Sequence, residues 1–142
     1  MPPQRKVDLI FDSVKRLLRV GATANLSNLL QKQHPADLAQ IFSELPERDR
    51  LAAFAVLVER NSRLAMETLS ELAPEAGAQL LAGRSAEEIA KLVQELPSDD
   101  AAALIDNLPD ELSAAVLELM GRKESGEVVG FNVEEYLPAK EA

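Results

Sequence analysis

Carboxylates in the second half of the chain are the side chains best suited to chemistry. Asp99 and Asp100 are adjacent, and Glu67, Glu71 and Glu75 recur at intervals of four residues. Mg²⁺ prefers oxygen ligands and keeps several waters while it contacts one or two carboxylates. Ca²⁺ prefers the same donors, and no acidic pair is diagnostic alone, so the sequence offers a partial site for a hard divalent cation, Mg²⁺ or Ca²⁺, which another domain would complete. Helix capping and the helix dipole explain an Asp-Asp pair at a helix start at least as well.

Catalysis has little support in the residue types present. The chain has no Cys and only one His, His34, so neither a cysteine nucleophile nor a pair of histidines is available. His34 directly precedes Pro35 at an expected helix start, where a histidine usually caps or packs. The glycines form no phosphate-binding loop. The sequence predicts a protein that is not an enzyme.

Charge is distributed unevenly along the chain. Residues 1–33 hold six bases and two acids, a net charge of +4, whereas residues 64–120 hold two bases and twelve acids, a net charge of −10. The total of −9 argues against a nucleic-acid partner. The longest apolar run, 51–58, is far shorter than the roughly 20 residues of a membrane span. Without a signal peptide either, we expect a cytoplasmic chain that does not insert into a membrane.

Short apolar stripes repeat along the centre of the chain. The first stripe is Leu38, Ile41, Phe42 and Leu45, the i, i+3, i+4, i+7 pattern of a two-turn helix. Further copies begin at positions 51, 65, 77, 89, 101 and 112. They include Leu51, Phe54, Ala55 and Val58, and also Leu112, Ala115, Val116 and Leu119. Such short helices are marginal alone and must stack on one another.

Residues between the stripes support the same fold. Prolines separate several stripes, and a longer first helix is expected to end at Gly21, followed by a short helix through 26–30. Ser85 and Glu88 have the spacing of a capping box, and Ser98 is the expected N-cap of the next helix. The prediction is an all-α, right-handed superhelix of about ten short stacked helices over residues 1–120. Residues 121–142 are interpreted as a linker towards a missing downstream domain, with a frayed tail as the alternative.

Two stretches carry a family resemblance. The stretch His34-Pro-Ala-Asp-Leu-Ala-Gln-Ile-Phe-Ser-Glu-Leu-Pro46 closely resembles the opening of the cytosolic N domain of MgtE-type magnesium transporters. The stretch from Ile89 to Ile105, which contains the Asp-Asp pair, looks like a characteristic segment of that domain. The resemblance covers about residues 14–120, and the tail lies where the family continues into paired CBS domains.

The resemblance implies a regulatory Mg²⁺ sensor. In the family, Mg²⁺ bridges acidic residues of the N domain to the CBS domains and to the helix leading to the pore, so that high Mg²⁺ favours the closed state. The implied ligands are Asp99 and Glu67, with Asp100 adjacent. Some members carry another Asp four residues after the first of the pair, whereas this chain has Ala103. Mg²⁺ binding is thus expected to be weak and to need the partner domain.

The resemblance also implies partners and a location. The partners would be the CBS domains and the transmembrane domain of the same polypeptide, in a homodimer on the cytosolic side of the inner membrane. A second resemblance remains open, because the middle domain of the flagellar motor switch protein FliG has a similar His-Pro opening and similar helices. On that alternative the chain is a protein-interaction module in which metal plays no part.

Overall fold

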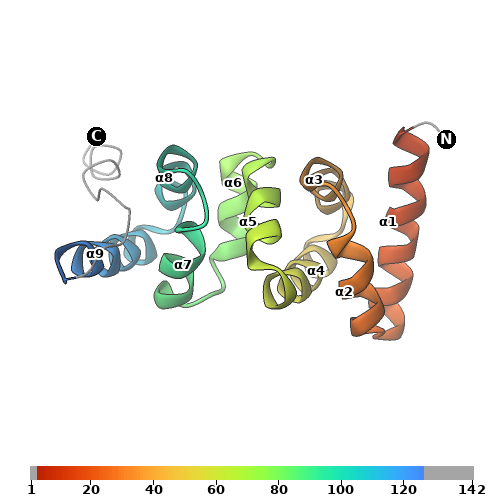
Figure 1. Cartoon of the computed structure of the whole chain (residues 1–142), viewed down its shortest axis with the longest axis horizontal. Helices are drawn as coiled ribbons and strands as arrows, with labels where there is room; N and C mark the ends of the chain where they lie inside the picture. The colour runs from red at the N-terminus through yellow and green to blue at the C-terminus, as the bar shows by residue number, and fades with distance from the viewer. Residues whose placement is uncertain (1–2, 127–142) are drawn as a thin grey trace. The chain divides into compact units, whose positions relative to one another are not determined.

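The computed structural model describes residues 3–126, which form nine helices and no strand (Figure 1). The all-α class and the stacking of short helices are confirmed. The helices fall into two compact units, Met1–Leu72 and Ala73–Ala142, and each is described by itself.

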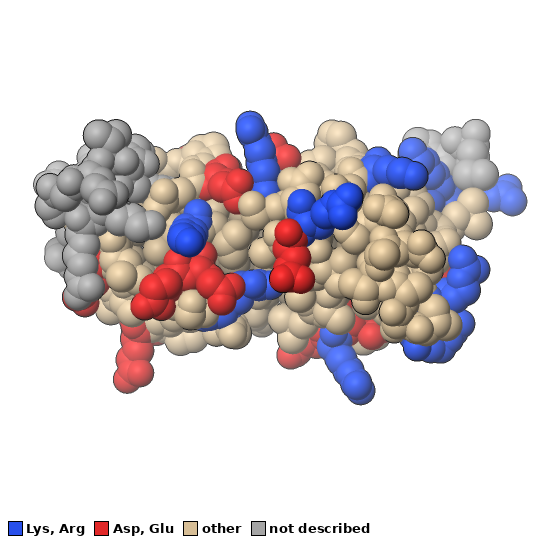
Figure 2. Space-filling model, turned by 60° about the horizontal axis from the view of Figure 1, so that its bottom comes forward, with Lys and Arg blue, Asp and Glu red and all other residues tan. Residues whose placement is uncertain are grey.

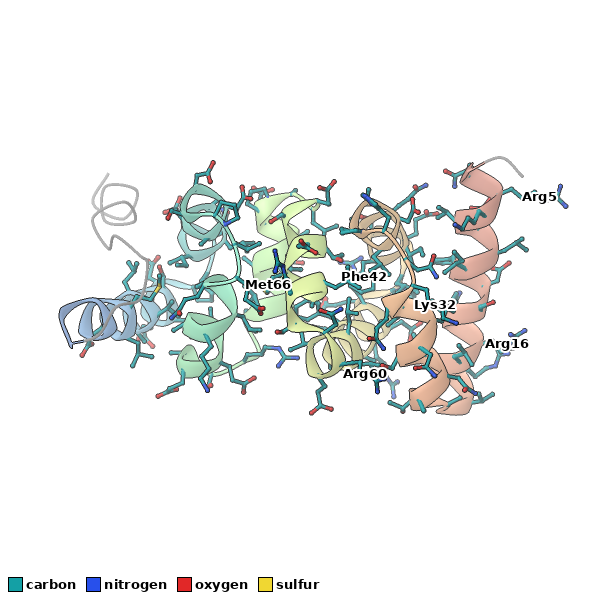
Figure 3. The ribbon with its side chains drawn as sticks, viewed as in Figure 1. Arg5, Arg16, Lys32, Phe42, Arg60 and Met66 are labelled. Atoms are coloured by element: carbon teal, nitrogen blue, oxygen red, sulfur yellow. The ribbon has the colours of Figure 1, made fainter. Side chains whose placement is uncertain are left out.

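The first unit contains five helices. They are α1 (Pro3–Val20), α2 (Thr23–Gln31), α3 (Pro35–Glu44), α4 (Glu47–Arg60) and α5 (Ser62–Ser70). Helix α1 packs against α2, α3 and α4, while α5 packs against α3 and α4. Phe42 and Met66 are fully buried within this unit, whereas Arg5 and Arg16 point outwards from α1 (Figure 3). The apolar stripe beginning at Leu38 forms the centre of the core, since all four of its side chains are buried.

The second unit contains the remaining four helices of the described residues. They are α6 (Pro74–Leu81), α7 (Ala86–Val93), α8 (Ser98–Asp106) and α9 (Asp110–Gly126). Helix α7 packs along α9, and α8 contacts both α6 and α9. The core here is built from the stripes predicted in α6, α7 and α8, with Leu81, Ile89, Val93 and Ile105 almost fully buried.

Most helix starts and stops agree with the sequence signals. Helix α1 ends before Gly21, whose φ of 73° suits a residue without a Cβ. His34 caps α3, because its Nδ1 accepts a hydrogen bond from the Ala36 N–H at 3.1 Å. Ser85 caps α7 in the same way, accepting from the Glu88 N–H at 3.1 Å. The capping function predicted for His34 and Ser85 is confirmed.

The N-cap predicted for α8 is wrong. Pro97, not Ser98, occupies the N-cap position, and no side chain caps the helix there. Pro97 already has an extended ψ of 150°, so the helix begins one residue earlier than a serine cap would place it.

Two helices turn a different face inwards from the one predicted. In α4, Leu51 and Ala55 are exposed and the buried residues are Ala53, Phe54 and Leu57. In α9, the buried positions are Ser113, Val116, Leu117 and Met120, whereas Leu112, Ala115 and Leu119 are half-buried. Both segments have apolar residues on more than one side of the helix. Packing against the neighbouring helices therefore determines which side is buried.

The expected boundary at residue 120 falls within a helix. Helix α9 continues to Gly126. The rest of the predicted linker, residues 127–142, lies outside the described residues.

Candidate functional site

Asp99 and Asp100 occupy the first turn of α8. Asp99 is exposed and Asp100 is half-buried. Asp99 Oδ1 accepts a hydrogen bond from the Asp100 backbone N–H at 3.1 Å. Acidic side chains in the first turn of a helix interact favourably with the partial positive charge at its start. The interpretation of this pair as helix-start residues is therefore supported. In this position the Asp99 carboxylate remains accessible to solvent and to ions.

Ala103 lies one turn after Asp99 on α8, at the i, i+4 position. Its side chain is half-buried, and its carbonyl oxygen accepts a hydrogen bond from Asn107 Nδ2 at 2.8 Å. An aspartate at this position would place a second carboxylate beside that of Asp99. With alanine there, α8 lacks that carboxylate.

Glu67 is on α5, in the first unit. Its side chain is 47% exposed, and Oε2 lies 3.9 Å from Nε of Arg63, whose side chain is 78% exposed. An exposed ion pair at this distance contributes little to stability and is easily exchanged for water or another ion. Glu67 is thus an accessible carboxylate with one weak partner.

The acidic series with four-residue spacing does not lie on one helix. Glu67 is inside α5, Glu71 is the C-cap of that helix, and Glu75 is in the first turn of α6 in the second unit. The spacing therefore does not produce one face of three carboxylates. It places one acid on the first unit's last helix, one at its end and one at the start of the next unit.

The predicted metal ligands are split between the units, with Glu67 on the first and Asp99 and Asp100 on the second. Among residues 3–126, no group of three or more His, Asp or Glu side chains is arranged to hold a metal ion. The donors that are present suit Mg²⁺ chemically, because one or two accessible carboxylates can serve an ion that keeps most of its waters.

A groove in the first unit was not predicted. It has a volume of about 530 Å³ and lies between α1 and α4, lined by Lys15, Leu18, Arg19, Arg48, Asp49 and Ala52. The sequence signal was the net charge of +4 in residues 1–33, but the contribution of Arg48 depends on how α4 packs against α1.

Comparison with known families distinguishes between the two families that the sequence resembles. The family described as the MgtE intracellular N domain matches residues 33–131, which is 99 of the 142 residues. The chain belongs to this family. The resemblance to the MgtE N domain, based on the His34–Pro46 stretch, is therefore confirmed. It is a domain family of transporters and not an enzyme family.

The other two comparisons found no match for this MgtE N domain. No curated protein and no solved structure matches the chain. Helices α1 and α2 precede the matched residues. Within the part of the chain that the structure describes, every helix is too short or too polar to cross a membrane.

Proposed function

We propose that this MgtE N domain is a cytosolic Mg²⁺-sensing domain that regulates a magnesium transporter through Mg²⁺-dependent docking on CBS domains. The family match over residues 33–131 carries the proposal. The charge distribution supports it, because residues 64–120 hold twelve acids against two bases. Such a segment is well suited to respond to a divalent cation.

The accessible carboxylates give the proposal its chemistry. Asp99 is exposed at the start of α8, and Glu67 is exposed on α5 with a single weak ion pair. Mg²⁺ held between these acids and a second acidic surface would cancel the repulsion between the two surfaces. When the ion leaves, repulsion separates the surfaces, and the open state of the pore is favoured.

Weak affinity is a consequence of the site's composition. Ala103 removes one carboxylate from α8, and each unit contributes at most two of the proposed ligands. The partial positive charge at the start of α8 also opposes a cation beside Asp99. The downstream partner must therefore supply further oxygens, so that Mg²⁺ is bound firmly only in the docked state.

Limited proteolysis of the full-length transporter tests this proposal. Cleavage within 121–142 should become slower as Mg²⁺ rises into the millimolar range, because docking shields that segment. Asp99→Asn should shift the protection to higher Mg²⁺, while Glu44→Gln, which removes an exposed acid outside 64–120, should leave it unchanged. Identical protection in wild type and Asp99→Asn would show that Asp99 is only a helix-start residue.

A further inference from the structure

The groove between α1 and α4 is strongly basic. Lys15 and Arg19 of α1 face Arg48 of α4 across it, with Asp49 as the single acid in its lining. Among residues 3–126 none of these three cations forms an ion pair, and Lys15 Nζ lies 5.6 Å from the centroid of the Phe11 ring. Figure 2 shows Lys and Arg side chains gathered at the α1 end of the first unit. One carboxylate, Asp49, lies beside three cations that repel one another, and this excess of positive charge indicates an external anion.

Exposed apolar side chains lie on the two helices that form this groove. Leu9, Val20 and Leu51 are 51%, 64% and 40% exposed, and they are the only large hydrophobic residues in the described part of the chain with this degree of exposure. All three lie on α1 or α4, the two helices that form the groove. Val20 directly follows Arg19, and Leu51 is one turn after Arg48 on the same face of α4.

The outer face of α1 has the same mixed character. Arg5 and Arg16 point outwards from α1, on the side away from the helices that it packs against (Figure 3). Leu9 is one turn after Arg5, and Val20 is one turn after Arg16, so cations and apolar side chains alternate along one face. Cations beside exposed Leu and Val are the composition of a helix that lies at a membrane interface.

We propose that the outer face of α1, together with the adjoining groove between α1 and α4, docks on an anionic phospholipid membrane. Its residues are Lys15, Arg19 and Arg48 with Leu9, Val20 and Leu51, and we call it the α1–α4 surface. The cations would bind headgroup phosphates, and the three apolar side chains would enter the interface. A soluble phosphate would use the cations but would leave the apolar residues exposed. An intracellular domain of a transporter is tethered beside a membrane, which raises its effective concentration there.

The proposal is independent of Mg²⁺ sensing. The α1–α4 surface contains none of the proposed Mg²⁺ ligands, and α1 precedes the residues that match the family. The acidic segment 64–120 is repelled by the same lipids, so attachment has to occur through the basic residues. Binding measured in a metal-free buffer therefore distinguishes this inference from the proposed function.

Vesicle co-sedimentation of the 142-residue chain tests the charge requirement. Vesicles of phosphatidylcholine with one third phosphatidylglycerol should bind the chain at low salt, and pure phosphatidylcholine vesicles should not. Arg19→Gln/Arg48→Gln should weaken binding about tenfold or more, because each cation near an anionic surface contributes to attraction. The control Lys32→Gln/Arg60→Gln removes the same charge from exposed positions outside the groove and should bind within about twofold of wild type.

Two further measurements distinguish binding to a membrane from binding to a soluble anion. Val20→Ser/Leu51→Ser keeps every charge and should still weaken vesicle binding several-fold. Inositol hexakisphosphate, a soluble polyphosphate, should compete only weakly. If the serine variant binds vesicles as wild type does, or if the polyphosphate binds while vesicles do not, the groove is a site for a soluble anion and the proposal is wrong. Equal loss in the groove and control variants would also overturn it. If the double glutamine variant misfolds by circular dichroism, Lys15→Gln alone replaces it.

Discussion

The Arg50 side chain joins α4 to the end of α3 by donating a hydrogen bond from Nε to the carbonyl oxygen of Phe42, at 2.7 Å. Its Nη2 donates to the carbonyl oxygen of Leu45 at 2.9 Å. These carbonyls belong to the last turn and the C-cap of α3, where backbone oxygens carry partial negative charge, and the Phe42 oxygen also accepts from the Leu45 N–H at 3.3 Å. One guanidinium therefore fixes the turn between the two helices.

Replacing Arg50 should destabilise the first unit. Arg50→Ala leaves the carbonyls at the end of α3 without this donor, and we expect the free energy of unfolding to fall by about 1–3 kcal/mol. Arg50→Lys should recover only part of the loss, because an ammonium cannot reproduce the forked geometry. Urea unfolding followed by circular dichroism measures both. Arg48→Ala, at an exposed position on the same helix, is the control, and an equal loss there would contradict the capping function.

The face that α4 buries can be tested with two leucines. Leu57 is fully buried and Leu51 is 40% exposed. Leu57→Ala should lower the free energy of unfolding by about 2–5 kcal/mol, whereas Leu51→Ala should change it by no more than about 0.5 kcal/mol. Thermal melts of the two variants provide the comparison. If Leu51→Ala lowers the free energy of unfolding more than Leu57→Ala does, α4 buries the face predicted from the sequence and the packing of Leu57 in the core is contradicted.

Ser113 offers a substitution that should not cost stability. It is fully buried in α9, and within the described residues its Oγ has no hydrogen-bond partner. Ser113→Ala removes an unsatisfied hydroxyl, so the melting temperature should stay constant or rise. Thr68→Val is the contrasting variant, because the Thr68 Oγ1 donates to the Leu64 carbonyl oxygen at 2.8 Å, and its loss should cost about 0.5–1.5 kcal/mol. A clear loss of stability in Ser113→Ala would mean that the hydroxyl is in fact bonded.

Local signals predicted the helices well. Gly21 ends α1, and His34 and Ser85 cap their helices, because each of these effects depends on a few neighbouring backbone atoms. The stripe beginning at Leu38 was predicted correctly because it is the only apolar face of α3. In the run from Leu51 to Val58, by contrast, nearly every face is apolar, and the neighbouring helices determine which side is buried.

The candidate site was less predictable than the fold. The position of Asp99 in the first turn of α8 follows from Pro97 and the acids themselves, but the four-residue spacing from Glu67 to Glu75 does not show that α5 ends before Glu75. Whether Glu67 and Asp99 act together depends on a partner surface, and no pattern within this chain encodes that surface. The groove at Arg48 was missed for a related reason, since its residues come from helices far apart in the sequence.

Magnesium should stabilise the chain even without its partner. The twelve acids of 64–120 repel one another, so Mg²⁺ at about ten times its dissociation constant should add about 1.4 kcal/mol and raise the melting temperature by about 3–6 °C. The comparison is with KCl at the same ionic strength, which screens charge without binding specifically. An unchanged melting curve would contradict Mg²⁺ binding by the chain alone and assign all of the affinity to the docked state.

Inhibition of transport by Mg²⁺ on the cytosolic side of the full-length transporter, measured in proteoliposomes, tests the regulatory function most directly. Transport by the wild type should fall as this Mg²⁺ rises. The Glu67→Gln/Asp99→Asn variant should need about thirtyfold more Mg²⁺, because two lost carboxylate contacts at about 1 kcal/mol each weaken the docked state by about 2 kcal/mol. Glu44→Gln/Glu59→Gln, which removes two exposed acids outside 64–120, should behave as wild type. If the Glu67→Gln/Asp99→Asn variant is inhibited at the same Mg²⁺ concentration as wild type, these carboxylates do not sense the ion and the proposed function is contradicted.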